Sequence, residues 1–595
     1  MKVVFVNAVS KFKYGDLYIG SLILAKILKK NGYEVEIVDF AYLHNIGELD
    51  SDVFENGNTA ELSEYLINKK ADIISFYTMA NSYHLSIDMA EYIRSNAPDI
   101  KLLFGGPQAS VAAYDLMNTF PFIDLIGIGE GENSIVDIMK AFEGEKDFSK
   151  IKGICYRKGT EIITNEENGL IQDLDTLPEI DYELIPYMDK MKSLPIEVGR
   201  GCPFGCKYCS SKSFWKQKFR LKSNDRIISE IKSLMKEYNI THFSFIHDLF
   251  TANKKRIIEF CNKIIEEELK IKWACSARID TLDNEIIEML VRAGCTGIYI
   301  GVETGSSRMQ KFINKNLKIN DDFYNKIKLL TKNKIQVTAS FIYGLPNEEL
   351  EDLKETFKVI KNLRDMNVHT VQLHMFSILR GTEFYNEYSH DMSFDDNLVS
   401  DITYGANMKR NTELITKYPN LFSHFYILNK SLVKKYPYCD MFMNHYIQIL
   451  YTMFRITYNN LIDYFKCDFL AFYNSFYKYL AANSKELINY SDNIDVEHKH
   501  FVYKVIDIWK EYINSYKFEK YDNIIKEIYR FECDLNDFIF NNEENEDAIK
   551  TYDFDVYDAN KKTFKLDEYM PKETIIRIYK PDGVYKLQRL RKKIS

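Results

Sequence analysis

Three cysteines stand close together in one glycine-rich segment of the chain. Cys202, Cys206 and Cys209 have the spacing C-x3-C-x2-C, and the segment from residue 197 reads EVGRGCPFGCKYC. Iron–sulfur clusters are held by thiolates, normally four on a [4Fe–4S] cube. Three thiolates leave one iron open, and an open position is what a catalytic metal site needs. We therefore predict that these three cysteines are the metal ligands of a [4Fe–4S] cluster.

Two alternative hypotheses for these cysteines, a structural zinc site and a redox pair, explain the sequence less well. A structural zinc site would need a second Cys or His pair at ligand spacing, and the sequence shows none. A C-x-x-C redox pair formed by Cys206 and Cys209 would explain neither Cys202 nor the glycines. The other seven cysteines occur singly and are expected to be buried structural thiols.

The cysteine segment follows the first of six apolar runs that alternate with amphipathic helical stretches. The expected strands are Ile196–Val198, Phe243–His247, Lys272–Ala277, Gly297–Val302, Gln336–Tyr343 and Thr370–Phe376. Strands alternating with helices indicate a parallel α/β sheet. Six such units predict a partial (β/α)6 TIM-like barrel over residues 195–385, with functional loops after its strands.

A second alternation of strands and helices fills residues 1–145 and predicts a doubly wound, Rossmann-like parallel sheet. Ligands of such sheets bind beyond the carboxyl ends of the strands. Those ends carry Asn7, Ser75, Gly105-Gly106 and Gly129-Glu130. Neither G-x-G-x-x-G after the first strand nor G-x-x-x-x-G-K-[ST] occurs, so a nucleotide site is the weaker hypothesis.

The remaining segments differ in character. Residues 146–194 are expected to form a connector with a small hairpin at Gly153–Thr164. Residues 386–595 are rich in Tyr, Asn, Phe and Lys and are expected to be mainly helical, with long helices at His445–Asn459 and Leu461–Ala481. An acidic stretch (Asn541–Asp547) and a hairpin (Thr574–Tyr579 with Val584–Leu587) are expected near the end of the chain.

Composition restricts the class of protein. The 595 residues have a net charge of −8, without the basic excess that a nucleic-acid binder carries. No apolar stretch reaches the roughly 18–20 residues of a membrane-spanning helix. The apolar run at the N-terminus meets polar and charged residues too soon for a signal peptide, so we expect a buried first strand and a cytoplasmic protein.

The cysteine segment resembles the signature of the radical S-adenosylmethionine (SAM) superfamily, in which an aromatic residue precedes the last cysteine, as Tyr208 does here. Further segments resemble later motifs of that superfamily in the same order: FIHDLF from residue 245, ARID from 277, GCTGIYIGVETG from 294, SFIYGLP from 340, and Gly381-Thr382. The resemblance spans about residues 195–385.

This resemblance implies that the open iron binds the amino and carboxylate groups of SAM and that the reduced cluster cleaves SAM to a 5′-deoxyadenosyl radical. Glu303 would lie near SAM, and the backbone at Ile342 and Gly344 would lie along the adenine. Arg278 would pair either with a SAM carboxylate or with Asp280. The residues expected to bind SAM are Tyr208, Glu303, Arg278, Ile342 and Gly344. His247 and Asp248 are pocket candidates, although a carboxylate at a strand end often caps a loop.

The N-terminal region resembles a cobalamin-binding domain, in which the nucleotide tail passes a small hydroxyl residue and a Gly-Gly turn. The expected cobalamin contacts are Asn7, Ser75, Gly105, Gly106, Gly129 and Glu130. The D-x-H-x-x-G motif is absent from residues 7–18, which read NAVSKFKYGDLY, so no histidine ligand to the lower face of cobalt is expected. His84 is interpreted as a residue of a helix start. The alternative is a Rossmann-like domain without a cofactor.

Together the two resemblances imply a cobalamin-dependent radical SAM enzyme, most often a methyltransferase acting on an unactivated carbon. One SAM would methylate the cobalt, and another would give the radical. The alternatives are a cyclase or rearrangement enzyme without methyl transfer, and a non-catalytic cobalamin carrier or sensor with a structural cluster. The expected partners are a peptide or small-molecule substrate, bound by the C-terminal domain, and a reductant such as flavodoxin or ferredoxin.

Overall fold

The computed structural model describes residues 1–7, 18–49, 59–185, 187–395, 398, 408–484, 499–541, 548–556, 566, 571–579 and 586–590. The chain divides into two compact units, Met1–Pro437 and Tyr438–Ser595. The segment 8–17, where the sequence lacks the cobalt-ligating motif, lies outside the described residues, as does the acidic stretch from residue 542 onward. None of the described helices is long and apolar enough to cross a membrane.

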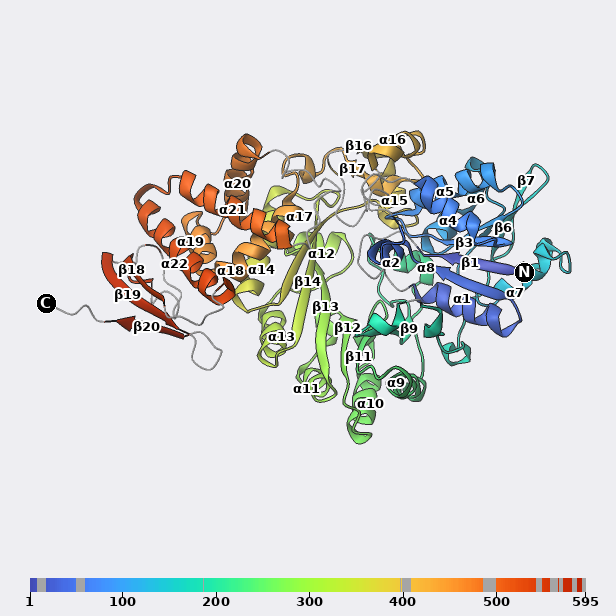
Figure 1. Ribbon diagram of the computed structural model, residues 1–595, viewed down its shortest axis with the longest axis horizontal. Helices are drawn as coiled ribbons and strands as arrows, with labels where there is room; N and C mark the ends of the chain where they lie inside the picture. The colour runs from blue at the N-terminus through green and yellow to red at the C-terminus, as the bar shows by residue number, and fades with distance from the viewer. Residues whose placement is uncertain are drawn as a thin grey trace. The chain divides into compact units, whose positions relative to one another are not determined.

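The first unit begins with a seven-stranded sheet of order β2-β1-β3-β4-β5-β6-β7. Its parallel strands are β1 (Lys2–Val6), β2 (Glu34–Val38), β3 (Ile73–Tyr77), β4 (Lys101–Gly105) and β5 (Leu125–Gly127). Helices α1 (Ile19–Lys30) and α7 (Ile135–Phe142) cover one face, and α4 (Thr59–Asn68), α5 (Tyr83–Asn96) and α6 (Pro107–Thr119) cover the other (Figure 1). This confirms the predicted doubly wound fold. The strand order places the ligand crevice between the carboxyl ends of β1 and β3.

The hairpin expected within the connector belongs to this sheet. Strands β6 (Ile154–Lys158) and β7 (Glu161–Thr164) continue the sheet in antiparallel pairing from β5. Ile154 and Cys155 are fully buried, so the hairpin extends the core of the sheet. An isolated two-stranded hairpin is marginal in water, which is the physical reason that it pairs with an available edge.

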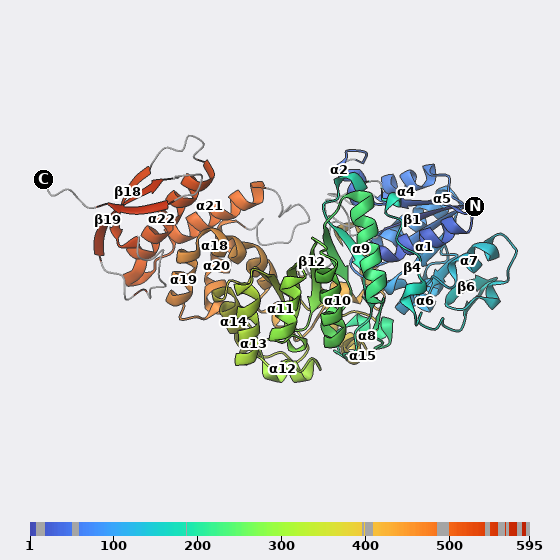
Figure 2. The same cartoon turned by 90° about the horizontal axis from the view of Figure 1, so that it is seen from below.

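The predicted partial barrel is confirmed as a six-stranded parallel sheet of order β15-β14-β13-β12-β11-β8. Its strands are β8 (Leu194–Glu197), β11 (His242–Ile246), β12 (Lys272–Ala277), β13 (Cys295–Glu303), β14 (Gln336–Tyr343) and β15 (Thr370–Met375). The helices between them are α9 (Asn224–Tyr238), α10 (Lys254–Glu266), α11 (Asn284–Arg292), α12 (Ser307–Phe312), α13 (Asp321–Lys332) and α14 (Leu350–Asp365) (Figure 2). Helix α11 shows why these segments become helices on a barrel. Asp283 caps its N-terminus, and it buries one apolar face that includes Ile286 and Leu290.

The residues that follow the barrel pack against the rest of the first unit. They include α15 (Glu383–Tyr388), α16 (Met408–Lys417) and the antiparallel pair β16 (Met392–Phe394) and β17 (Tyr426–Leu428). The Ser423 hydroxyl donates to the carbonyl of Ile378, and the Ser431 hydroxyl donates to that of Gly344. The compact first unit therefore continues to Pro437, beyond the expected barrel limit at residue 385.

The second unit is mainly helical, as predicted, with an aromatic core. Its helical segments are α17 (Cys439–Met441), the π-helical Phe442–Ile447, α18 (Gln448–Met453), α19 (Arg455–Tyr464), α20 (Phe469–Asn483), α21 (Lys499–Ser515) and α22 (Asp522–Asn541). Trp509 is fully buried and stacks on Phe476. The predicted long helix His445–Asn459 is interrupted at Phe454, whose backbone is not helical. Strands β19 (Pro571–Tyr579) and β20 (Lys586–Leu590) match the expected hairpin, and β18 (Ala548–Phe554) adds a third strand.

Candidate functional site

The three cysteines lie on the loop after the first barrel strand. This loop runs from β8 through the two-residue β9 (Gly199–Arg200) to the short helix α8 (Ser210–Trp215), whose N-cap is Cys209. A Cβ atom on Gly201, which has a φ of +84°, would collide with the Lys218 carbonyl. Glycine is therefore required there, because no other residue combines a positive φ with so close an approach.

Neighbouring barrel loops hold the cysteine loop in place. The Lys207 N–H donates to the Ile313 carbonyl at 3.0 Å. The Asn314 side-chain amide donates to the Gly205 carbonyl at 2.9 Å. Both anchors follow β13, so two separate strand ends meet at the cysteines.

The donor set fits a cluster with one open iron. Cys202, Cys206 and Cys209 are free thiols, and sulfur is the ligand that iron–sulfur clusters require. Among the described residues, no three His, Cys, Asp or Glu side chains could share a single metal ion. The thiolates of a cube bind three different irons, so they do not have to converge on one point.

Arg278 stands beside the cysteine loop at the end of β12. Its guanidinium lies 3.8 Å from the centre of the Phe204 ring and forms two hydrogen bonds to Asp280, at 3.0 and 2.7 Å. The Nη1 atom is buried and has no partner among the described residues. The structure thus forms the predicted pair with Asp280 and leaves one donor for an anionic group. Binding of SAM by Arg278 stays a prediction.

Glu303 ends β13 in a strained conformation. Its φ is +70°, and the register between β13 and β14 shifts at this point. The carboxylate is buried and accepts a hydrogen bond from Lys315 Nζ at 2.6 Å. Burial, together with the charge of Glu303, raises the pKa of the Tyr208 phenol well above its ordinary value. The structure therefore brings two of the predicted SAM residues together, and it adds Lys315, which sequence reasoning missed.

Ile342 and Gly344 lie at the carboxyl end of β14. Ile342 and Tyr208 pack against one and the same cluster of buried apolar side chains. Gly344 has a φ of +80°, and a Cβ atom there would lie 2.4 Å from the Val433 side chain. Its N–H donates to Glu348 at 2.6 Å, and burial raises the pKa of Glu348 to about 8. The segment after the barrel therefore closes over this strand end.

Of the two pocket candidates at the end of β11, His247 is buried and Asp248 is exposed. Burial lowers the pKa of His247 to about 4. Desolvation of its carboxyl group raises the pKa of Asp248, although a hydrogen bond from Ser211 opposes this shift. Ser211 belongs to α8, so Asp248 also ties the helix after the cysteines to the next strand.

Asn7 and Asp39 meet at the carboxyl edge of the N-terminal sheet. Asn7 follows β1 and Asp39 follows β2, and both are buried. Asp39 accepts a hydrogen bond from the Tyr187 hydroxyl at 2.9 Å. The Asn7 side-chain oxygen is buried and accepts none from the described residues. An unsatisfied polar atom at a ligand-binding strand end fits a missing hydrogen-bond donor such as a cofactor amide.

The Gly-Gly turn after β4 is held by Thr78, a residue that sequence reasoning missed. The Thr78 hydroxyl donates to the Gly105 carbonyl at 2.8 Å and accepts from the Ala109 N–H at 2.9 Å. Gly106 has a φ of +93°, and a Cβ atom there would lie 2.9 Å from the Thr78 carbonyl oxygen. At Gly105 the space is open. Such a turn leaves room for a cofactor close to its backbone, and the contact of Gly105 and Gly106 with cobalamin stays a prediction, as does that of Ser75, which lies buried in β3.

Glu130 reaches from the N-terminal sheet to the barrel. It follows β5 and accepts hydrogen bonds from Arg200 at 2.7 Å and from Arg220 at 2.9 and 3.0 Å. Arg200 also binds Glu132 and Glu197. Burial alone would lower the pKa of Arg200, but these carboxylates raise it above its ordinary value. The role of Glu130 and Gly129 in binding cobalamin stays a prediction.

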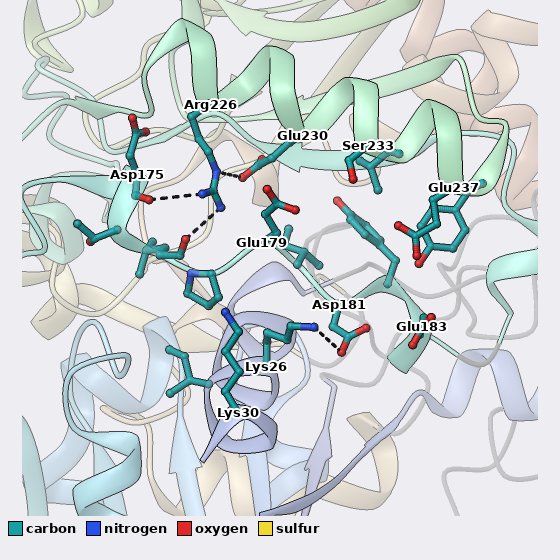
Figure 3. A pocket seen from close by; sticks show the side chains of 18 of the residues that line it. Lys26, Lys30, Asp175, Glu179, Asp181, Glu183, Arg226, Glu230, Ser233 and Glu237 are labelled. Carbon is teal, nitrogen blue, oxygen red and sulfur yellow. Dashed lines mark hydrogen bonds and ion pairs between the residues drawn. The ribbon is translucent and has the colours of Figure 1, made fainter. Parts of the chain in front are cut away.

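A separate cavity of about 720 Å³ lies between α1, residues 175–183 and α9 (Figure 3). Its lining is strongly charged, with Lys26 bound to Asp181 and Arg226 bound to Glu230. None of the residues predicted to bind a cofactor lines it.

The sequence matches two families over these two sheets. Residues 5–139 match the B12 binding domain, and residues 196–360 match the Radical SAM superfamily. This chain is a cobalamin-dependent radical SAM enzyme. Its cofactors are a [4Fe–4S] cluster, SAM and cobalamin.

The proteins similar in sequence to this chain include one named as a methyltransferase and one named as a cyclase. The uncharacterized methyltransferase PH0819 of Pyrococcus horikoshii is 28% identical over 325 residues, which cover 54% of this chain and 70% of that protein. The anaerobic magnesium-protoporphyrin IX monomethyl ester cyclase of Rubrivivax gelatinosus is 26% identical over 432 residues, which cover 70% of this chain and 74% of the cyclase.

Two groups of solved structures share the fold. The cobalamin-dependent SAM radical enzyme OxsB, with aqua-cobalamin and SAM bound, has a TM-score of 0.60 and 18% identity, and the match covers 91% of this chain and 82% of OxsB. The radical SAM methyltransferase TsrM of Kitasatospora setae, with cobalamin and a [4Fe–4S] cluster bound, has a TM-score of 0.54 and 14% identity, covering 66% of this chain and 80% of TsrM.

Proposed function

We propose that this chain is a C-methyltransferase acting on an unactivated carbon of a peptide or small natural-product substrate. The observation that carries the proposal is the contact between the two cofactor-binding regions. Glu130, at the carboxyl edge of the N-terminal sheet, binds Arg200, which stands two residues before Cys202. Methyl transfer to a carbon radical needs a methyl carrier and a radical source at one substrate, and these two edges face each other.

The predicted site residues have three separate roles in this proposal. Cys202, Cys206 and Cys209 hold the cluster, while Asn7, Ser75 and the Gly105-Gly106 turn receive cobalamin. Tyr208, Arg278, Glu303, Ile342 and Gly344 bind and orient SAM. When bound, these cofactors supply hydrogen abstraction and methyl transfer. The segment after the barrel, through Ser431 and Val433, excludes water from the end of β14.

The sequence-based domain limits complete the proposal. Residues 1–145 bind cobalamin, residues 146–194 connect, residues 195–385 form the radical SAM barrel, and residues 386–595 recognise the substrate. A flavodoxin or ferredoxin supplies the electron, and the enzyme works in the cytoplasm.

A second candidate is a cyclase or rearrangement enzyme that transfers no methyl group. The relative in Rubrivivax gelatinosus, named as a cyclase, matches 70% of this chain and supports it. Both candidates use the same cofactors, so their products must distinguish them.

The test is made on protein purified and reconstituted without oxygen, with hydroxocobalamin, SAM and dithionite or titanium(III) citrate. A methyltransferase forms both S-adenosylhomocysteine and 5′-deoxyadenosine, measured by mass spectrometry. A cyclase forms 5′-deoxyadenosine alone, which would contradict the proposal. A carrier binds cobalamin and forms neither product. The triple variant Cys202→Ala/Cys206→Ala/Cys209→Ala is expected to lose its iron and all 5′-deoxyadenosine.

A further inference from the structure

A buried cluster of charges joins the loop after β5 to the cysteine loop. It contains three carboxylates and two guanidinium groups: Glu130, Glu132, Glu197, Arg200 and Arg220. The side chains of Arg200, Arg220, Glu130 and Glu132 are 5, 6, 2 and 7% exposed. Removing charges from water is costly unless every charge is paired with good geometry. So dense a buried cluster indicates a contact whose geometry matters.

Arg200 is the centre of this cluster. It binds Glu130 through Nη1 at 2.7 Å, Glu132 through Nη2 at 2.6 Å and Glu197 through Nε at 2.8 Å. Guanidinium groups offer donors in a rigid planar fork. Three carboxylates around one fork therefore define both the position and the orientation of the Arg200 backbone.

Arg220 holds the other side of Glu130. Strands β9 and β10 (Arg220–Leu221) pair antiparallel, with Arg200 opposite Arg220. The connector takes part, because the Ile171 N–H donates to Glu130 at 2.6 Å and the Ile171 carbonyl accepts from Arg220 at 2.5 Å. Glu130 is thus held by both strands of the ribbon and by the connector.

Residues that belong to the cluster of charges, or contact it, stand both before and after the cysteines in the sequence. Arg200 lies two residues before Cys202. Trp215, at the end of α8, lies six residues after Cys209, and its ring stands 5.9 Å from the Arg200 guanidinium and 5.4 Å from that of Arg220. Both ends of the loop are therefore fixed to the edge of the N-terminal sheet.

We propose that Arg200, Arg220, Glu130 and Glu132 are positioning residues that set the distance between the cobalamin-bearing edge and the iron–sulfur cluster, and so couple SAM cleavage to methyl transfer. The inference rests on the proposed function, because only a reaction that uses both cofactors together needs their spacing to be fixed. It assigns to Glu130 a role through Arg200, in addition to any direct contact with cobalamin.

The test compares Glu132→Gln, at a carboxylate that binds Arg200 and is not a predicted cobalamin contact, and Arg200→Lys with the control Glu230→Gln. Glu230 is also buried, but the cations that hold it, Lys222 and Arg226, both belong to the barrel region. Each protein is loaded with iron, sulfide and cobalamin. The first measurement is the magnetic dipolar interaction between cob(II)alamin and the reduced cluster, by pulsed electron paramagnetic resonance. It needs no substrate. The second is the ratio of 5′-deoxyadenosine to S-adenosylhomocysteine.

We expect Glu132→Gln to keep the iron and cobalamin content of the native enzyme but to broaden the distribution of cobalt–cluster distances. The ratio of 5′-deoxyadenosine to S-adenosylhomocysteine should rise severalfold. Arg200→Lys keeps the positive charge but loses the planar fork, so its distance distribution and product ratio should lie between those of the native enzyme and those of the carboxylate variant. Glu230→Gln should match the native enzyme in both.

A native distance distribution and ratio in both variants would overturn the inference. So would loss of the cofactors in both, since the charges would then serve only to hold the fold together. If the native enzyme itself makes no S-adenosylhomocysteine, the proposed methyltransferase function is wrong. The measured cobalt–cluster distances would still test whether these residues set the spacing of the two cofactors.

Discussion

The buried carboxylate of Glu303 illustrates what a single residue contributes to this site. It combines a positive φ with an ion pair to Lys315, and both side chains are less than a tenth exposed. A non-glycine residue with a φ of +70° costs free energy and persists only where its surroundings determine it. The strain aims a charged carboxylate at the strand end where the sequence resemblance places SAM.

Replacing Glu303 by Gln should weaken SAM binding about tenfold or more, because a charge-assisted hydrogen bond contributes roughly 1.5–3 kcal/mol. Iron content should stay unchanged, since no cysteine contacts are lost. Equilibrium dialysis of SAM on the reconstituted protein measures the effect. Glu355→Gln, on the exposed side of α14, is the matched control. Native SAM affinity in Glu303→Gln would remove Glu303 from the binding site.

At the scale of elements, the turn between β4 and α6 carries much of the cobalamin hypothesis. Its two glycines differ in kind. Gly106 has a positive φ and sits against the Thr78 backbone, whereas Gly105 has an ordinary φ and open space around it. The fold therefore requires glycine at position 106. It does not require glycine at position 105, where the absence of a side chain leaves room for a ligand.

Gly106→Ala should lower the free energy of unfolding by about 1–3 kcal/mol, because alanine is strained at this φ and its methyl group meets the Thr78 carbonyl. Gly105→Ala should leave the unfolding midpoint unchanged and still weaken cobalamin binding. Thermal unfolding and cobalamin absorbance after gel filtration measure the two effects. If Gly105→Ala binds cobalamin like the native chain, the corrin does not approach that residue.

At the scale of the whole first unit, helix α5 of the N-terminal sheet packs against the segment after the barrel. His84 and His424 are both buried, and both contact the Phe425 ring, His84 edge-on and His424 at a tilt. Neither ring nitrogen of His84 has a hydrogen-bond partner among the described residues. Burial lowers the pKa of His84 to about 3, and burial together with His84 lowers that of His424.

This contact should make the first unit sensitive to acid. Below its usual pKa of about 6.5, His84 is protonated in the unfolded chain but not in the folded one, so stability falls as the pH falls. The loss is about 2 kcal/mol at pH 5 for one such histidine. His84→Phe should flatten the decrease in the unfolding midpoint between pH 7 and pH 5, while His369→Gln, at an exposed position, should not. An equally steep decrease in His84→Phe would show that other groups cause it.

Local patterns in the sequence determined a large part of this protein. The cluster ligands lie within eight consecutive residues, so their spacing alone indicates the iron–sulfur chemistry. The strands and helices of both sheets were predictable because apolar periodicity is a local property. The matches to the B12 binding domain and the Radical SAM superfamily agree with these predictions.

The tertiary structure decided which distant residues meet. Lys315 reaches Glu303, Glu130 reaches Arg200 seventy residues away, and His84 meets the segment of His424. Pairing of β6 with β5, and of β7 with β6, likewise depends on which sheet edge is free. These contacts leave no periodic or spacing signal, because they form only when the strands, once packed, bring separate loops to a common edge.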